Sequence, residues 1–312
     1  MKAVRNAPPS VEVVDVDEPE GEGELVRVVA TGICASDLKY LRWGSTQIAG
    51  HEFAGVLEDG TAVAVEGFFG CGKCAQCEQG TYNMCTAGPP TAPGMLSPGG
   101  MSEWFRAPRH VLVPLPPGLD VADASLVEPG SVAWHSCHQG EIGPQTRVAI
   151  VGAGAIGLLA AASAQQMGAA EVAVEARHPH QHQSRECIVA VVPTSGYDVV
   201  IETGGSESAL QRAVELARVG GTVVHLGSYD PGTAWPMDAA FIKEVALRPS
   251  LGYCSHYGYR RDFVEAADLL AARPELTSAL ITHRFPIEDA VEAFRLAQDK
   301  SKGVFRVVVE PS

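Results

Sequence analysis

The sequence is poor in positive charge. Its 312 residues include 37 Asp and Glu but only 23 Lys and Arg, which leaves a formal net charge of −14. A field of that sign repels phosphate backbones and anionic lipid head groups. Nucleic acid and membrane surfaces are therefore excluded as expected partners. The chain also lacks internal repeats and low-complexity segments, so a repeat architecture is not expected.

The N-terminus has neither the apolar segment nor the cleavage site of a secretory signal peptide. The longest weakly polar run, residues 148–164, is rich in Gly and Ala and has no flanking aromatic belt. A buried strand, turn and helix explain it better than a membrane span. We therefore expect a cytoplasmic protein. The 46% hydrophobic and 19% charged content excludes disorder, and the length predicts about two domains.

The pattern of apolar and turn-forming residues differs between two parts of the chain. Residues 1–110 are typical of short strands and loops with Pro and Gly between them. From Arg147 onwards, apolar strand-like segments alternate with helical ones: VAIV is followed by a glycine turn and a helix, and then by EVAVEA, YDVVIET and GGTVVHLGS. This alternation predicts an α/β fold with a doubly wound parallel sheet of the Rossmann type.

Four of the eight cysteines lie within fifteen residues. Four thiolates at such short spacings can close a tetrahedral shell around zinc, and a closed shell has a structural rather than a catalytic role. The alternatives are buried free thiols or a redox pair, but in a reducing compartment a metal is favoured. The predicted ligands of this structural zinc are Cys71, Cys74, Cys77 and Cys85.

Three further segments, GICASD, GHEFAG and VEPGSVAWH, contain residues of metal-ligand types. Each alone is a weak signal, but together they offer one thiolate, one imidazole and one or two carboxylates. A catalytic zinc requires three protein ligands and an open position. Sequence spacing cannot show that these residues meet. The residues of these types are Cys34, Ser36 and Asp37 in the first segment, His51 and Glu52 in the second, and Glu128 in the third.

A glycine-rich turn follows the strand VAIV and begins an apolar helix. In GAGAIG, Gly152 permits a tight turn, Gly154 lets the backbone approach a pyrophosphate, and Gly157 lets the helix pack on the strand. Ala155 and Ile156 lie at the helix N-terminus, where free N–H groups favour anions. The motif predicts a dinucleotide site, although methyltransferases have similar loops.

The end of the next strand distinguishes NAD from NADP. An acidic residue there would bind the ribose hydroxyls, whereas a nearby Arg would accept a 2′-phosphate. The diagnostic position, about two dozen residues after Gly152, fits Ala176 slightly better than Glu175. Because Arg177 follows, NADP(H) is favoured over NAD(H).

In this order the motifs resemble those of the zinc-dependent medium-chain dehydrogenase/reductase family, of the alcohol dehydrogenase type. The matching segments span nearly the whole chain: GICASD, GHEFAG, CGKCAQCEQGTYNMC, GGMSEW, VEPGSVAWH, VGAGAIG and FRVVVE. The resemblance implies a GroES-like, β-rich catalytic domain (residues 1–137 and 285–312) with a zinc lobe at about 71–85. The Rossmann domain (residues 138–284) is inserted into it. It also implies a homodimer or homotetramer.

The resemblance further implies a reaction and its residues. Cys34 and His51 match catalytic zinc ligands, while Glu52 and Glu128 both match positions of a third, carboxylate ligand, so which of them binds stays open. Ser36 matches the hydroxyl that contacts the substrate oxygen and begins a proton relay. Where some relatives end that relay with His, this chain has Lys39, which puts the end of the relay in doubt. With two zinc ions and NADP(H), the expected substrate is a small alcohol or carbonyl compound.

Two other functions stay open at this stage. The chain could be a non-catalytic sensor that keeps the fold and binds the dinucleotide without turnover. Alternatively, a zinc protein could use its glycine loop for another adenosyl cofactor, such as S-adenosylmethionine. Two segments are also shorter than in the family. One precedes the cysteine cluster and the other follows the second strand of the nucleotide domain, where a shortened helix is expected.

Overall fold

The computed structural model of the chain describes residues 1–87, 92–178, 181–182, 188–189, 191–255, 260–299 and 302–311. Within these ranges, no helix is long and apolar enough to cross a membrane. The chain forms two compact units. The first contains Met1–Glu128 and Cys254–Ser312, and the second contains Pro129–Tyr253.

These bounds differ from those expected from sequence. Residues 254–284 belong to the first unit, because backbone and side-chain contacts tie them to it. Ser255 N–H donates to Gly80 O at 2.8 Å, and Arg261 forms an ion pair with Glu66. No composition change marks this junction, so the sequence offered no signal for it.

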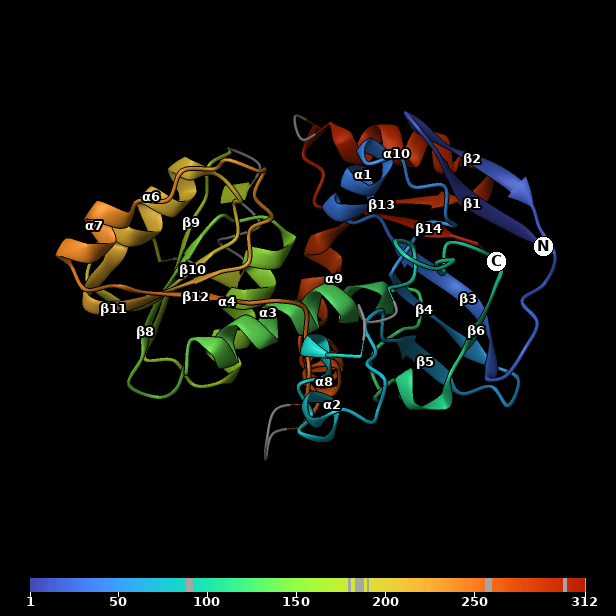
Figure 1. Cartoon of the computed structure of the whole chain (residues 1–312), viewed down its shortest axis with the longest axis horizontal. Helices are drawn as coiled ribbons and strands as arrows, with labels where there is room; N and C mark the ends of the chain where they lie inside the picture. Colours follow the sequence, from blue (N-terminus) through green and yellow to red (C-terminus); the bar gives the residue numbers. More distant parts are fainter. Residues whose placement is uncertain are drawn as a thin grey trace. The chain divides into compact units, whose positions relative to one another are not determined.

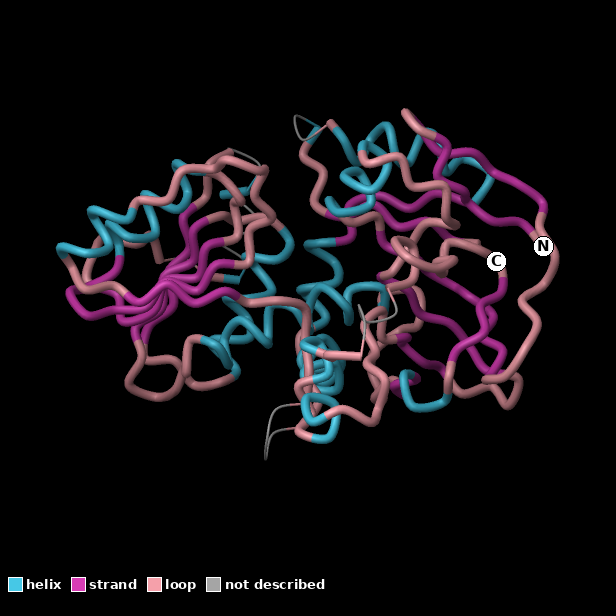
Figure 2. Tube along the Cα trace, viewed as in Figure 1, coloured by secondary structure: helices cyan, strands magenta, loops and turns pink. Residues whose placement is uncertain are grey.

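The first unit is β-rich, as Figures 1 and 2 show. A hairpin of β1 and β2 stands beside a larger sheet with the order β13-β14-β3-β4-β5-β7, in which β6 also pairs with β3. The pairs are antiparallel except for β13 and β14. The strands are β1 (Lys2–Ala7), β2 (Ser10–Asp15), β3 (Glu24–Gly32), β4 (Glu52–Leu57), β5 (Ala62–Val65), β6 (Trp104–Ala107), β7 (Leu112–Pro114), β13 (Ile281–Pro286) and β14 (Arg306–Glu310).

Short helices join these strands. Two apolar clusters, one centred on β3–β5 and one beneath α10, form the core of this unit. The helices are α1 (Ala35–Arg42), α2 (Ala75–Glu78), η1 (Tyr82–Met84), η2 (Arg109–Val111), η3 (Ala124–Leu126), α8 (Asp262–Ala272), α9 (Pro274–Leu280), η4 (Ile287–Asp289) and α10 (Ala290–Gln298). Helix α3 (Val127–Gln139) carries the chain into the second unit.

The second unit contains a fully parallel sheet with the order β12-β11-β10-β8-β9. Figure 1 shows α6 and α7 on one face of this sheet and α3 and α4 on the other. The elements are β8 (Arg147–Val151), α4 (Ala155–Gln166), β9 (Glu171–Glu175), β10 (Tyr197–Glu202), α6 (Glu207–Leu216), β11 (Ala217–His225), α7 (Met237–Ile242) and β12 (Ala246–Pro249).

Burial on both faces explains why this sheet is parallel. The central residues of β8, Val148, Ala149 and Ile150, are fully buried, as expected for a strand covered by helices on both sides. The strand order reverses between β8 and β10, which is the doubly wound arrangement predicted from sequence. The shortened helix expected after β9 falls mostly on residues outside the described ranges.

Candidate active site

The pairing of β3 with β4 brings distant candidate ligands together. Gly32, the last residue of β3, lies opposite Glu52, the first residue of β4. Cys34 follows β3 as the N-cap of α1, and His51 directly precedes β4. Ligand atoms of Cys34, His51 and Glu52 consequently lie within 4.8 Å of one another. A Cβ on Gly32 would lie 2.5 Å from a Glu52 carboxylate oxygen, so glycine is needed there.

Asp37, a residue of the GICASD segment to which the sequence gives no role, contacts two of these residues. Its Oδ2 accepts a hydrogen bond from the Cys34 N–H at 2.8 Å, and its Oδ1 lies 3.1 Å from Nδ1 of His51. Burial lowers the pKa of His51, but Asp37 and Cys34 together raise it well above its usual value. A buried carboxylate behind a histidine is the usual partner of a metal-binding imidazole.

Ser36 lies on the first turn of α1 beside the same imidazole. Its Oγ is 3.2 Å from Nε2 of His51. The Tyr40 ring, one turn further along the helix, has its centroid 6.1 Å from that of His51. Burial raises the pKa of Tyr40, and a hydrogen bond with Ser36 opposes that effect. The Ser36 hydroxyl therefore stands between an imidazole and a phenol.

Glu52 is neutralised by an arginine from the far end of the chain. Nη1 of Arg306, the first residue of β14, lies 2.8 Å from both carboxylate oxygens of Glu52. Both side chains are buried. Burial lowers the pKa of Arg306, yet Glu52, Cys34 and Glu128 outweigh this effect and raise it. A buried carboxylate of this kind requires such a partner, because an unpaired buried charge is costly.

Glu128 approaches the same group from α3. It is buried, and burial together with the Glu52 charge raises its pKa to about 8. Its electrostatic coupling to Glu52, His51 and Arg306 places it near the cluster, although it is not among the residues whose ligand atoms lie within 4.8 Å of one another. The buried carboxylates of Glu52 and Glu128 therefore both interact with the positive charge of Arg306.

This donor set has the chemistry of a zinc site. It offers one thiol, one imidazole with a supporting carboxylate, and two candidate carboxylates, and zinc accepts sulfur, nitrogen and oxygen ligands. Arg306 neutralises Glu52, and a metal ion would offset the charge of the second buried carboxylate, Glu128. The residues present therefore fit a metal ion with three protein ligands.

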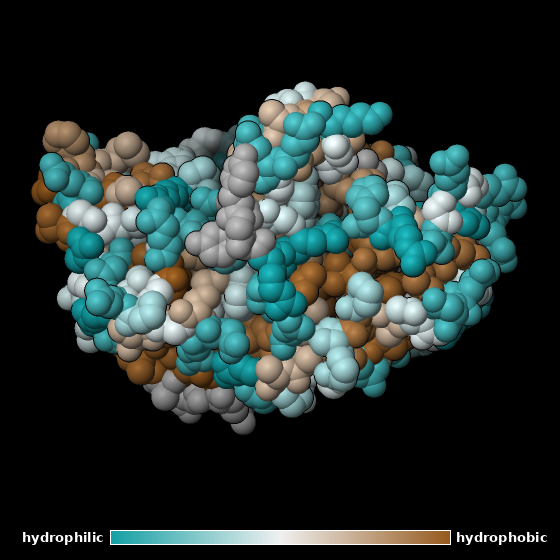
Figure 3. All heavy atoms as spheres, turned by 90° about the horizontal axis from the view of Figure 1, so that it is seen from below, coloured by the Kyte–Doolittle hydropathy of each residue, from teal (hydrophilic) through white to brown (hydrophobic). Residues whose placement is uncertain are grey.

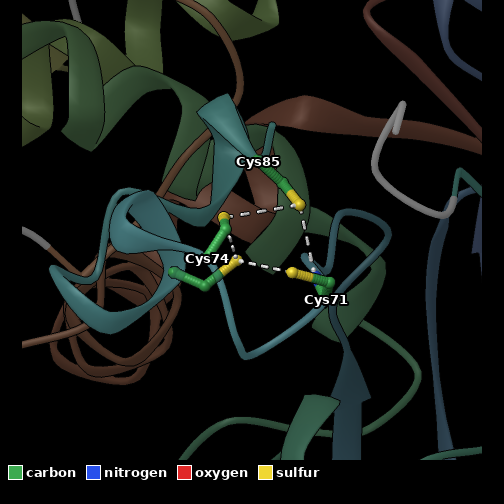
Figure 4. A group of neighbouring side chains, drawn as sticks. Cys71, Cys74 and Cys85 are labelled. Atoms are coloured by element: carbon green, nitrogen blue, oxygen red, sulfur yellow. Dashed lines mark hydrogen bonds between the residues drawn. The ribbon is translucent and has the colours of Figure 1, made fainter. Parts of the chain in front are cut away.

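The four clustered cysteines converge in the loop around α2 and η1. Figure 4 shows Cys71, Cys74 and Cys85 with their sulfur atoms facing one another. The Sγ–Sγ distances are 3.5 Å for Cys74 and Cys77, 3.9 Å for Cys74 and Cys85, and 4.0 Å for Cys71 and Cys77. A tetrahedral ion with Zn–S bonds of about 2.3 Å requires sulfurs about 3.8 Å apart, so the geometry fits zinc.

The backbone favours thiolates in this lobe. Backbone N–H groups of Thr86 and Cys77 lower the pKa of Cys74 to about 5, whereas burial raises the pKa of Cys77 to about 12. All four cysteines are free thiols. A Cβ on Gly70 would lie 2.4 Å from Sγ of Cys77, so glycine lets the chain pass close to the sulfurs.

The glycine turn between β8 and α4 has the geometry of a phosphate-binding loop. Gly152 has φ +110°, and a Cβ on Gly157 would lie 1.8 Å from Gly152 O. By contrast, a Cβ on Gly154 would meet nothing within 4 Å. Open space at Gly154, next to the N–H groups of Ala155 and Ile156 at the start of α4, fits a pyrophosphate.

The end of β9 carries a charge pair that sequence reasoning missed. Oε2 of Glu175 lies 2.8 Å from Nε of Arg212 on α6. Ala176 follows Glu175, and Arg177 is exposed, with its backbone N–H donating to Oε1 of Gln181. The acidic alternative for the ribose hydroxyls is therefore already paired with an arginine.

The residues whose roles were not predicted differ in whether the sequence carries a signal for them. Asp37 lies inside the GICASD segment, and an acidic residue three positions after a helix N-cap is a sequence signal for a bond back to the N-cap backbone. Arg306 is 254 residues from Glu52, and Arg212 is 37 residues from Glu175. Neither pair has a local sequence signal.

Two family profiles together match most of the chain. The profile of the alcohol dehydrogenase GroES-like domain matches residues 21–117, and the profile of the glucose dehydrogenase C-terminus matches residues 122–307. D-xylulose reductase A of Aspergillus oryzae is 30% identical over 314 residues, which cover 86% of this chain and 85% of that protein.

Solved structures are similar over the full length. L-idonate 5-dehydrogenase of Escherichia coli is 26% identical with a TM-score of 0.86, covering 99% of this chain and 97% of that chain. A zinc-binding dehydrogenase of Sinorhizobium meliloti bound to NADP is 28% identical with a TM-score of 0.85, covering 99% of each chain. With both profile matches in the expected order, the chain belongs to the zinc-dependent medium-chain dehydrogenase/reductase family, as an oxidoreductase of the alcohol dehydrogenase type.

Proposed function

We propose that this enzyme transfers a hydride between NADP(H) and a polyhydroxylated alcohol or its carbonyl form, at a zinc ion held by Cys34 and His51. The observation that carries the proposal is the convergence of Cys34, His51 and Glu52 within 4.8 Å of one another, with the Ser36 hydroxyl beside them. Zinc would supply Lewis acidity towards the substrate oxygen, and nicotinamide would carry the hydride.

The chain's own residues supply orientation and proton transfer. Asp37 holds the His51 ring and the Cys34 backbone in place. The Ser36 hydroxyl lies 3.2 Å from Nε2 of His51 and beside the Tyr40 phenol, and it can accept the proton of a substrate alcohol while its own proton passes towards solvent. Nη1 of Arg306 pairs with both carboxylate oxygens of Glu52. Glu128 then has the role of the third, carboxylate ligand, or exchanges it with Glu52.

The cofactor preference rests on the end of β9. Ala176 offers no carboxylate to a ribose, Glu175 is paired with Arg212, and exposed Arg177 is available to a 2′-phosphate. These features favour NADP(H) over NAD(H). A similar structure, the dehydrogenase of Sinorhizobium meliloti, is described as bound to NADP.

The second zinc would occupy the cysteine lobe. The sulfur separations around Cys74 fit a tetrahedral ion, and the four thiols leave no open position for substrate. Its role would be to hold the lobe, giving two zinc ions per chain.

The substrate class is supported by a pocket of about 330 Å³ at the C-terminal end of α1. Its lining includes Tyr40 and Trp43 together with residues of the loop that follows α1, Ser45, Thr46 and Gln47. Aromatic faces beside closely spaced hydrogen-bonding groups suit a chain of C–H and O–H groups. Similar proteins are named for xylulose and idonate, which are polyhydroxylated compounds.

The second unit supports a homodimer or homotetramer. Exposed apolar side chains occur on α7 and at Val219 of β11, whose neighbour Gly220 donates its N–H to the carbonyl of Lys243 after α7, and β12 forms the edge of the parallel sheet. Figure 3 shows brown, apolar atoms at the left of the view, the side on which Figure 1 draws α7. A second copy of the chain would cover such a patch. Its members are Val219, Met237, Phe241 and Ile242, of which Phe241 is 83% exposed.

A spectrophotometric panel tests this function. Zinc-replete enzyme is mixed with NADPH or NADH and a series of aldehydes, ketones and ketoses, and with the oxidised cofactors and a series of alcohols and polyols. We expect turnover with a polyol–ketose pair and faster turnover with NADP(H). Tight cofactor binding without turnover on any substrate would instead indicate a dinucleotide sensor.

A further inference from the structure

A buried carboxylate ties together the two loops that follow β10 and β11. Glu202, the last residue of β10, is fully buried. Its Oε1 accepts hydrogen bonds from the N–H groups of Gly204 at 2.6 Å and Gly205 at 2.8 Å. Its Oε2 accepts a hydrogen bond from the Tyr229 hydroxyl. Oε1 therefore binds the loop after β10, and Oε2 binds the loop after β11.

The two loops touch through their backbones. A Cβ on Gly227 would lie 2.5 Å from Cα of Gly205 and 2.6 Å from Oε2 of Glu202. Gly205 has φ +64°, which also favours glycine. Only a glycine at position 227 permits this approach, so the carboxylate and the two glycines form one packed unit.

Aromatic packing fixes the donor of the interloop bond. The Tyr229 ring packs against both His225, with centroids 5.8 Å apart, and Trp235, with centroids 5.4 Å apart. The His225 and Trp235 rings meet edge to face at 4.7 Å. The Tyr229 hydroxyl is therefore held towards Glu202 by its neighbours.

This unit lies on a particular side of the sheet. In a doubly wound sheet a dinucleotide crosses the carboxyl ends of the strands where the strand order reverses, here between β8 and β10. The glycine loop after β8 takes the pyrophosphate, and the adenosine half lies towards β9. The nicotinamide half then lies over the ends of β10 and β11, where Glu202 and Tyr229 meet.

We propose that Tyr229, acting through Glu202, is a positioning residue for the nicotinamide half of the cofactor and has no part in binding the adenosine half. The inference rests on the proposed dinucleotide-dependent function. The bond orders the two loops before the cofactor arrives, so that binding does not have to supply their ordering. Its loss therefore weakens the intact cofactor and spares a fragment that lacks nicotinamide.

The chain offers a matched control on the same strand. Tyr197, the first residue of β10, donates its hydroxyl to Oε1 of Glu171 at 2.9 Å. The chemistry matches that of Tyr229 and Glu202, but the bond lies at the amino end of the strand, away from the cofactor edge. Tyr197→Phe and Tyr229→Phe each remove one hydroxyl and keep the ring.

Titration calorimetry on the full-length enzyme tests the proposal. Wild type is titrated with NADPH and with NADH. The cofactor that binds more tightly is then compared with its fragment that lacks nicotinamide, which is 2′-phospho-ADP-ribose for NADPH and ADP-ribose for NADH. For Tyr229→Phe we expect about tenfold weaker binding of the intact cofactor and unchanged binding of the fragment. For Tyr197→Phe we expect both to stay as in wild type.

Other outcomes overturn the inference in distinguishable ways. Equal cofactor affinity in wild type and Tyr229→Phe removes the positioning role and leaves the proposed function standing. Parallel loss of fragment and cofactor in Tyr229→Phe shows a general structural role instead. Binding of neither NADPH nor NADH by wild type overturns the proposed function together with this inference.

Discussion

Asp37 fixes the backbone of one candidate ligand and the imidazole of another. Because one of its oxygens holds Cys34 and the other faces His51, the two ligand side chains share a support within a single turn of α1. Supporting carboxylates of this kind set the orientation of the imidazole and increase its basicity. The effect of Asp37 should therefore be seen in the metal as well as in the rate.

Replacing Asp37 with Asn should lower kcat/KM and zinc affinity roughly 10- to 100-fold, because the amide keeps the size and loses the charge. Zinc content after dialysis against a competing chelator and steady-state kinetics measure the two effects. Asp123→Asn, which disturbs a more exposed ion pair with Arg284, serves as the control. Unchanged zinc affinity in Asp37→Asn would show that the carboxylate does not support a ligand.

The charge at the end of β9 should determine the cofactor preference. Arg177→Ala removes the exposed guanidinium, so KM for NADPH should rise about tenfold while KM for NADH stays nearly constant. The ratio of kcat/KM for the two cofactors is the measurement. Arg218→Ala, whose side chain pairs with Asp198 near the opposite end of the strands, should leave that ratio unchanged. Equal effects of Arg177→Ala on both cofactors would contradict the NADP assignment.

At the scale of elements, two glycines at the junction of β8 and α4 have different roles: Gly157 is needed for packing, and Gly154 for cofactor binding. Gly157 has no room for a methyl group, whereas Gly154 faces open space at φ −77°. The same substitution should therefore have different effects three residues apart.

Gly157→Ala should destabilise the fold by about 1–3 kcal/mol, since the added carbon would overlap the Gly152 carbonyl. Gly154→Ala should leave the unfolding temperature within about 2 °C of wild type and weaken NADPH binding about tenfold or more, because the methyl group occupies the space for phosphate. Thermal unfolding and cofactor titration measure both. A Gly154→Ala variant with wild-type affinity would exclude this loop as the phosphate site.

The cysteine lobe should behave as a separate stabilising element. It is joined to the rest of its unit by the Tyr82 hydroxyl, which donates to Glu66, and by the Gly80 carbonyl, which accepts from Ser255 N–H. Cys74→Ser should remove one zinc and lower the unfolding temperature by about 10 °C. Differential scanning fluorimetry with metal analysis checks this. Full zinc content with unchanged stability would contradict a structural ion.

At the scale of the whole molecule, the apolar patch on the second unit should control assembly. Phe241→Asp places a charge at the most exposed position of the patch. Light scattering should report smaller assemblies for this variant than for wild type, because a buried unpaired charge opposes association. If wild type is a monomer at micromolar concentration, the patch has another role.

The parallel sheet and the boundary between the two units differ in how well the sequence predicts them. The parallel sheet could be predicted, because Val148–Val151 and the following apolar segments alternate with glycine turns and helical stretches. The junction near residue 254 could not, because it depends on contacts such as Ser255 with Gly80, which have no local signature.

The candidate site shows the same division. The cysteine lobe is compact in sequence, so spacing alone predicted it. Cys34, His51 and Glu52 meet only through the register of β3 and β4, which spacing does not reveal, and the family resemblance supplied that link. The Arg306 partner of Glu52 and the Tyr229 partner of Glu202 became visible only in three dimensions.

The rate of NADPH-linked turnover by Cys34→Ala, measured at full occupancy of the cysteine lobe by zinc, tests the central claim most directly. We expect a folded protein with one zinc per chain instead of two and a turnover at least about a thousandfold below wild type. Wild-type turnover by this one-zinc variant would contradict the assignment of the chemistry to the Cys34 and His51 site.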